Sequence, residues 1–246
     1  MRRLMLSLAT VSVVGAFIAT PSAYAQQSVN FFVGGFVPAP LDSRGEISAG
    51  LSNDVLVRDL NFFAFRFDRF TGATFGGEYL VGIGDFFDAG ASIGYYQQTV
   101  PAVDANFVNS NGTNIAADFK LRIVPFTATF RVLPLGHRAP VVPYAGVGVG
   151  VNFWRYSESG FFVDYPANGT IPKTADIFGP ATFVGSGTRV GPVVLAGVRV
   201  PIGPMAPGFE VRWQQGKADL PSSDFAPGRV IDLGGINYLF TFNIRF

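Results

Sequence analysis

Apolar and polar residues alternate one by one along much of the chain, most clearly in its last nine residues. Between Tyr238 and Phe246, aromatic or branched apolar side chains occupy every second position, and Thr241, Asn243 and Arg245 lie between them. Successive side chains of a strand point to opposite faces, so this segment predicts a strand with one apolar face and one mostly polar face. A soluble sandwich would turn the apolar face inward, whereas a membrane barrel would turn it toward lipid.

Seven further segments predict strands. Together the eight are 29–37, 74–83, 89–98, 119–132, 142–156, 189–202, 209–215 and 230–246. The connections alternate between long (38–70, 99–116, 157–188, 216–229) and short (84–87, 133–140, 203–208). Outer-membrane barrels have an even number of strands, short periplasmic turns and long external loops. We therefore predict an all-β fold, a transmembrane antiparallel up-and-down β-barrel of eight strands with both termini on the periplasmic side. The segment 47–70 leaves ten strands as an alternative.

The alternation changes phase within the strand predicted at 119–132. Before Pro125 the apolar positions are Phe119, Leu121 and Ile123, and after it they are Phe126, Ala128, Phe130 and Val132. An extra residue in one strand shifts its side chains from one face to the other. We therefore predict a bulge at Val124-Pro125 that keeps the apolar residues on one side.

The composition favours a barrel in lipid. Hydrophobic residues make up 48% of the 246, charged residues 14%, and the mean hydropathy is +0.32, which is too apolar for a typical soluble domain. The part after residue 25 has no stretch of the roughly 20 apolar residues that a spanning helix needs. A closed barrel is the other arrangement that satisfies every backbone group in lipid. The net charge of +1 gives no reason to expect nucleic acid, and the absence of cysteine excludes disulfides and thiol chemistry.

The N-terminus has the organisation of a secretory signal. Arg2 and Arg3 precede an apolar run from Leu4 to Ile18, and Ala23-Tyr24-Ala25 matches a cleavage site. We predict a signal peptide at 1–25, cleaved after Ala25, and an outer-membrane β-barrel domain at 26–246. An uncleaved anchor is the alternative, although the run is short for a membrane span.

Charged residues recur on the face opposite the apolar one. The predicted barrel-interior charges are Glu78, Lys120, Arg122, Arg131, Arg199, Glu210, Arg212 and Arg245, and Asp88 shares their face. An eight-stranded barrel is just wide enough inside for side chains to fill, and buried charges of opposite sign should pair. Glycines at 146, 148 and 150 would leave room for the long side chains. We predict a filled polar core and no open pore; a proton or ion path is the alternative use of these charges.

Few residues of the sequence have side chains and surroundings suited to catalysis. His137 is the only histidine and lies in a short turn, so we interpret it as a solvated turn residue. Glu158 and Asp164 lie in a predicted loop with no apolar pocket to raise a pKa, and we interpret both as solvated charges. We therefore expect no enzyme, no catalytic residue, no metal and no cofactor.

Three segments carry a resemblance to a known family: Thr71–Tyr79, Pro143–Gly150 and Tyr238–Phe246. The chain resembles the small bacterial outer-membrane β-barrel proteins, of OmpW-like or opacity-protein-like type. The resemblance implies a multi-pass barrel in the bacterial cell outer membrane. The alternating residues Tyr238, Phe240, Phe242, Ile244 and Phe246 look like the C-terminal signal that such proteins present to the barrel-assembly machinery. In OmpW-like members the barrel is implicated in the passage of small hydrophobic molecules.

The resulting functional hypothesis is a non-enzymatic, porin-like membrane protein that is structural or handles small hydrophobic molecules passively. Its expected partners are outer-membrane lipid, the barrel-assembly machinery and small hydrophobic ligands, with no nucleic acid. The alternative is a surface adhesion or binding module that acts through the loops at 38–70 and 157–188. A lipid-modifying enzyme is a third, less favoured hypothesis.

Overall fold

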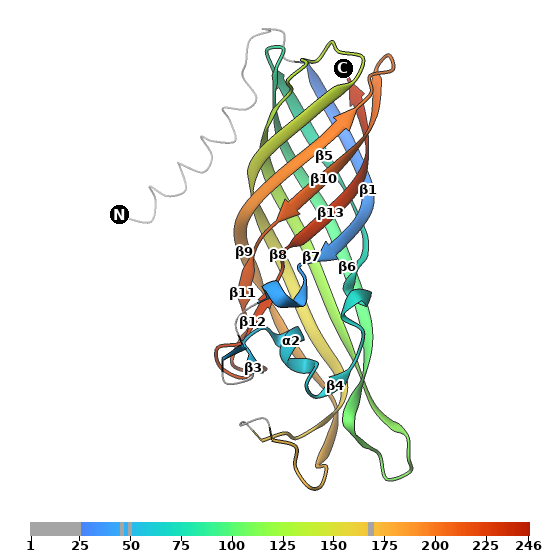
Figure 1. Ribbon diagram of the computed structural model, residues 1–246, viewed down its shortest axis with the longest axis vertical. Coiled ribbons are helices and arrows are strands. Elements are labelled where there is room, and N and C mark those ends of the chain that lie inside the picture. Colours follow the sequence, from blue (N-terminus) through green and yellow to red (C-terminus); the bar gives the residue numbers. More distant parts are fainter. Residues whose placement is uncertain (1–25, 45–46, 49–50, 167–169) are drawn as a thin grey trace, which may run out of the picture.

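The computed structural model describes residues 26–44, 47–48, 51–166 and 170–246 (Figure 1). The predicted signal peptide at 1–25 lies outside the described residues and stays a prediction. The barrel strands are β1 (Gln27–Pro38), β5 (Gly72–Ile83), β6 (Phe87–Val108), β7 (Asn114–Val132), β8 (Val142–Val163), β9 (Ile177–Arg199), β10 (Met205–Gln214) and β13 (Gly235–Arg245). The smaller elements are η1 (Leu41–Ser43), β2 (Ile47–Ser48), β3 (Leu51–Ser52), α2 (Val55–Asp59), β4 (Phe63–Ala64), η2 (Phe67–Phe70), β11 (Lys217–Asp219) and β12 (Val230–Asp232).

The eight long strands form one closed antiparallel ring. Strands that follow one another along the chain are neighbours, and β6 and β7 also pair. The ring closes because β13 pairs with β1, from Val29 opposite Ile244 to Val37 opposite Ile236. The predicted eight-stranded up-and-down barrel is confirmed, and the pairing of the last strand with the first closes it.

The segment 47–70 does not add two strands to the barrel. Its β2 and β3 are two residues each and pair only with one another, and α2 follows them. Its β4 pairs with β6 through Phe63 opposite Asp104, beyond the part of β6 that β5 covers. The ten-stranded alternative is therefore wrong. Among the described residues, no helix is long and apolar enough to cross a membrane.

The barrel wall is much taller on one side than on the other. Strands β6 to β9 have 19–23 residues, whereas β1, β5, β10 and β13 have 10–12. About ten residues suffice to cross a bilayer. Figure 1 shows β6–β7 and β8–β9 continuing as two hairpins away from the end that holds the C-terminus. The predicted strands 89–98 and 142–156 were too short because their outer faces become polar there, which we interpreted as the start of loops.

The predicted bulge at Val124-Pro125 is wrong. The register between β7 and β8 runs without a shift from Ala117 opposite Gly160 to Val132 opposite Ala145. Side chains therefore keep alternating through Pro125, and the apolar positions change from one face of the strand to the other. The change of phase in the sequence reflects a change in what each face meets.

Candidate functional site

The outer surface of the barrel carries a belt of exposed apolar side chains. The belt includes Phe31, Phe75, Ile93, Phe126, Val149, Val194, Phe209 and Phe240, which come from all eight long strands. On β13, Phe240 is 68% exposed while its neighbours Leu239 and Thr241 are 1% and 7% exposed. A soluble protein rarely exposes so large an apolar surface, whereas a barrel in lipid must do so.

Inside the belt, four charged side chains form a buried network that we call the charged layer. Arg131 Nη2 lies 2.6 Å from Glu78 Oε1 and 3.0 Å from Glu210 Oε2. Arg212 donates to Glu210 Oε1 from Nε at 2.9 Å, and its Nη2 lies 2.7 Å from the same oxygen. All four side chains are at most 5% exposed. Each carboxylate is thus shared by arginines, which offsets the cost of burying the charges.

Neutral donors complete the charged layer. Asn30 Nδ2 donates to Glu78 at 3.1 Å, and the Tyr144 hydroxyl donates to Glu210 at 3.1 Å. The Arg131 guanidinium also lies 4.9 Å from the centre of the Tyr144 ring. A Cβ at Gly146 would lie 2.9 Å from the Arg131 Cγ, so glycine makes room for the arginine there.

A second buried network closes the end of the barrel that holds the C-terminus. Asp88 accepts from Arg199 Nη2 at 2.8 Å and lies 2.7 Å from His137 Nε2. His137 Nδ1 also lies 2.8 Å from the Asp85 carbonyl oxygen. The interpretation of His137 as a solvated turn residue is therefore wrong, because the turn folds back over the barrel end. Arg245 is half-buried nearby, at a cavity of about 450 Å³ in this mouth.

Two of the predicted interior charges lie outside. Lys120 and Arg122 are exposed on the outer face of β7, whereas Leu121 and Ile123 are buried. The reason is the absence of the bulge: beyond Pro125 the inner face of β7 is apolar, and the charges take the face that meets water. The predicted polar core is therefore limited to the part of the barrel within the belt.

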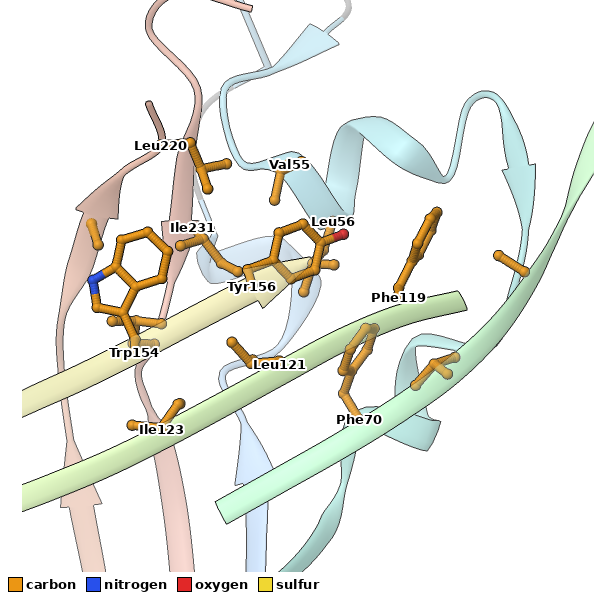
Figure 2. Packing of buried hydrophobic residues seen from close by; sticks show 14 of the residues in the cluster. Val55, Leu56, Phe70, Phe119, Leu121, Ile123, Trp154, Tyr156, Leu220 and Ile231 are labelled. Carbon is orange, nitrogen blue, oxygen red and sulfur yellow. The ribbon is translucent and has the colours of Figure 1, made fainter. Parts of the chain in front are cut away.

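The remaining interior is an apolar layer beyond the membrane belt (Figure 2). Phe119, Leu121 and Ile123 of β7 and Trp154 and Tyr156 of β8 form its floor. In Figure 2, Val55 and Leu56 of α2 lie over Tyr156, with Leu220 and Ile231 beside them. Leu56, Phe119 and Tyr156 have no exposed surface. The inner face of the tall wall is thus covered by the segments that enter and leave the short strands.

We call the segments that cover the apolar layer the cap; they are residues 39–44, 51–70 and 217–233. Asp54 joins the parts of the cap. Its carboxylate caps α2 by accepting from the Leu56 and Val57 amides at 3.1 and 3.3 Å. The same carboxylate meets Arg44 Nη1 at 3.3 Å and accepts from the Asp232 amide at 2.9 Å. One buried side chain therefore holds the first long connection against the last one.

A buried pair of carboxyl groups lies where the cap meets the wall. Asp59 ends α2, Glu158 lies on the inner face of β8, and the Tyr156 hydroxyl donates to Asp59 at 3.4 Å. Burial raises the pKa of Asp59 well above its usual range, and the charge of Glu158 raises it further. Burial raises the pKa of Glu158 to about 7, although hydrogen bonds from Tyr156 and protonated Asp59 lower it.

The interpretation of Glu158 as a solvated loop charge is therefore wrong, while Asp164 is exposed as expected. A signal for Glu158 was present in the sequence. Trp154, Tyr156 and Glu158 have the same parity, so continuing the strand by two residues would have placed all three on one face. The partner Asp59 had no such signal, because a long connection supplies it.

The barrel interior holds a small cavity among the described residues. A cavity of about 10 Å³ lies where the two layers meet, lined by residues that include Tyr96, Ile123, Gln214 and Asn237. That is about the space of one water molecule. Across the described parts of the chain, no three histidine or carboxylate side chains are arranged to hold a metal ion.

Comparisons with known proteins give the fold. No protein-family model and no curated protein matches the chain. The chain is similar to the crystal structure of the outer membrane protein OprG from Pseudomonas aeruginosa, with a TM-score of 0.50 and 11% identity over 90% of this chain and 96% of OprG. It is also similar to Neisserial surface protein A, with a TM-score of 0.43 and 13% identity over 90% of this chain and 97% of that protein. A third similar structure is Ail, the attachment invasion locus protein of Yersinia pestis, with a TM-score of 0.42 and 12% identity over 91% of this chain and all of Ail.

At these identities the likeness shows the fold alone. The chain folds as an eight-stranded barrel of the outer-membrane type, as the resemblance implied.

Proposed function

We propose that this chain is an integral barrel of the bacterial outer membrane that has no enzymatic role. Its role is structural, with passive handling of small hydrophobic molecules on the apolar side of its interior. The observation that carries this proposal is the division of the interior into a charged layer within the belt and an apolar layer beyond it. The exposed apolar belt supports the membrane location.

The two layers favour apolar over ionic solutes. Buried and mutually paired arginines and glutamates fill the cross-section within the belt, so an ion meets no open aqueous path there. The apolar layer instead offers aromatic and aliphatic side chains beneath a cap that is built from connections. Small hydrophobic ligands would reach this layer when the cap moves away from Tyr156 and Leu121.

Flux measurements in vesicles test this proposal. We expect the full chain in liposomes to give no stepwise ion conductance and to show saturable uptake of a neutral naphthalene dye. Ile123→Asp places a charge in the apolar layer and should reduce this uptake at least several-fold. Ala116→Asp, on the outer face of the same strand, is the matched control and should leave uptake unchanged. Absence of dye uptake would restrict the role to membrane structure, and recovery in the soluble fraction after cell lysis would contradict the membrane location.

The β8–β9 hairpin supports a second candidate function, which is contact with a partner surface. Phe161 and Phe178 of this hairpin and Ile171 of its connection are exposed, far beyond the membrane belt. Of the two connections considered for this role, 38–70 is largely folded into the cap, so the hairpin is the better contact. A loss of cell-surface attachment in Phe161→Ser/Phe178→Ser, with normal dye uptake, would favour this role.

We also propose that β13 presents an assembly signal to the barrel-assembly machinery. The exposed side chains of Tyr238, Phe240, Phe242, Ile244 and Phe246 form one apolar stripe on the outer face of this strand and support the proposal. Phe246→Gln should slow the appearance of folded barrel in cells, and Arg245→Gln should not. Equal assembly rates would contradict the proposal.

A further inference from the structure

Three cations lie on the outer face of the barrel immediately beyond the apolar belt. The belt ends on β7 at Val124, which pairs with the exposed Phe153 of β8. The next outward-facing row holds Arg122, with Gln97 of β6 on one side and Arg155 of β8 on the other. Lys120 lies one row further, opposite Ser157. We call Lys120, Arg122 and Arg155 the basic cluster.

The basic cluster has no counter-ion of its own. Arg122 and Arg155 face each other directly across neighbouring strands, an arrangement that is unfavourable for like charges. None of the three cations makes an ion pair within the parts of the chain that the structure describes, whereas Arg131 on the same strand is held by two glutamates. The carboxylate of Asp118 lies on the same outer face one further row from the membrane and forms no ion pair with Lys120. The cluster is therefore built to meet an anion from outside the chain.

The surface between these cations is a groove of about 320 Å³. Besides the basic cluster, Gln97, Ser157 and Ser159 line it and supply neutral donors. Guanidinium groups match the geometry of phosphate with paired N–H donors, and lysine adds a compact charge. A phosphate group is thus the anion whose size and hydrogen-bonding needs fit this groove.

The distance of the groove from the end of the apolar belt indicates where the phosphate comes from. Two residues along a strand span about 7 Å, which places Arg122 and Arg155 about that far beyond the end of the belt. The polar headgroup region extends about 5–8 Å on each side of the hydrocarbon core. The cations therefore lie within the headgroup layer, while Phe126 and Phe153 below them contact acyl chains.

We propose that the basic cluster is a binding site for the phosphate-bearing headgroup of a lipid in the external leaflet. The lipid acyl chains lie along the apolar belt, and the guanidinium groups of Arg122 and Arg155 bind the phosphate between β7 and β8. The site gives the barrel a preferred lipid on its tall side. This inference rests on the proposed membrane location, because only a bilayer brings a headgroup to this row.

Lipid binding to the full chain in detergent micelles tests the proposal. The probes are lipid A with two phosphates and the same lipid with its phosphates removed, and bound lipid is counted by native mass spectrometry. We expect at least tenfold tighter binding of the phosphorylated lipid. The variant Lys120→Gln/Arg122→Gln/Arg155→Gln should lose this preference. The variant Arg66→Gln/Arg69→Gln/Lys173→Gln removes three exposed charges elsewhere beyond the membrane and should keep it.

Three results would overturn the assignment of the basic cluster to a lipid phosphate. Equal loss of preference in both triple variants would reduce it to a general charge effect. Displacement of the lipid by 10 mM inorganic phosphate would assign the cluster to a free anion. A charge-conserving Arg122→Lys/Arg155→Lys variant should bind with intermediate affinity and fold normally. A barrel that inserts into liposomes and shows no preference between the two lipids would contradict this site alone, whereas failure to insert would contradict the proposed function.

Discussion

The interior of this barrel is charged where its outside meets lipid and apolar where its outside extends beyond the lipid. Strand β7 shows both states on one continuous backbone. Near the end of this strand, Arg131 is buried and Phe130 is exposed. Nearer its start, Leu121 is buried and Lys120 is exposed. In both places the apolar side chains lie on the face that does not meet water. Within the belt this is the outer face, and beyond the belt it is the inner face. A single rule thus gives opposite patterns in two halves of one wall.

The two layers also differ in what holds them together. The charged layer is fixed by ion pairs between barrel strands, so its geometry is set by the closed ring of hydrogen bonds. The apolar layer is closed by a cap made of connections, which α2, Asp54 and the carboxyl pair hold in place. The charged layer should therefore respond to loss of charge pairing and the cap to pH.

The largest expected effect is the loss of a shared cation from the charged layer. Arg131→Ala leaves Glu78 and Glu210 buried with fewer partners, and breaking such a network costs about 3–5 kcal/mol of unfolding free energy. The measurement is urea-induced unfolding in lipid vesicles. Asp118→Ala, on the outer face of the same strand, is the control and should change the free energy by less than about 0.5 kcal/mol. Similar losses in the two variants would contradict the assignment of the layers.

A charge on the outer face should be costly only within the belt. Phe240→Arg, midway along β13, should destabilise the barrel in lipid by about 2–4 kcal/mol if it lies near the bilayer midplane. Ala116→Arg, on the outer face of β7 beyond the belt, should have an effect near zero. The same unfolding measurement compares them, and a larger loss for Ala116→Arg would reverse the position of the membrane on the wall.

The smallest expected effect is a pH-dependent weakening of the cap. Because the docked cap raises the pKa of Glu158 from 4.5 to about 7, it holds a proton that the undocked cap releases. Docking is therefore strongest in acid and weakens as the pH rises through this range. Trp154, which packs in the apolar layer, reports the change through quenching of its fluorescence by acrylamide in a Trp213→Phe background.

Substitution of the carboxyl group distinguishes this explanation from a general effect of pH. The double variant Asp59→Asn/Glu158→Gln should abolish the change in quenching between pH 5 and pH 8, because burial raises the pKa of both carboxyl groups and neither neutral side chain can lose a proton. Asp164→Asn, which alters an exposed carboxylate nearby in the chain, should leave it in place. Persistence of the pH dependence in the double variant would show that a group outside the pair controls the cap. The other charged groups that interact with Asp59 are Asp54, the N-cap of α2, and Arg229, from the last long connection.

Much of the barrel was predictable because alternation is a local property. The existence of all eight strands and the exposure of Phe240 beside the buried Leu239 follow from the two-residue repeat, although it placed the ends of β6 and β8 too early. The same repeat placed Glu78, Arg131, Glu210 and Arg212 on the inner face. Lys120 and Arg122 were misplaced because we assumed that one face stays apolar along a whole strand, and a bulge was then needed to preserve that assumption.

The alternation of apolar and polar residues by itself determined where the strands lie along the chain and which residues share a face, since both depend only on neighbours in the chain. The choice between eight and ten strands required the tertiary structure. The tertiary structure decided which solvent each face meets, because that depends on how far the strand extends beyond lipid and what covers its inner side. It also brought Asp59 to Glu158 and His137 to Asp88. Those pairs join residues 99 and 49 positions apart, and only the folding of connections over the ends of the barrel brings them into contact.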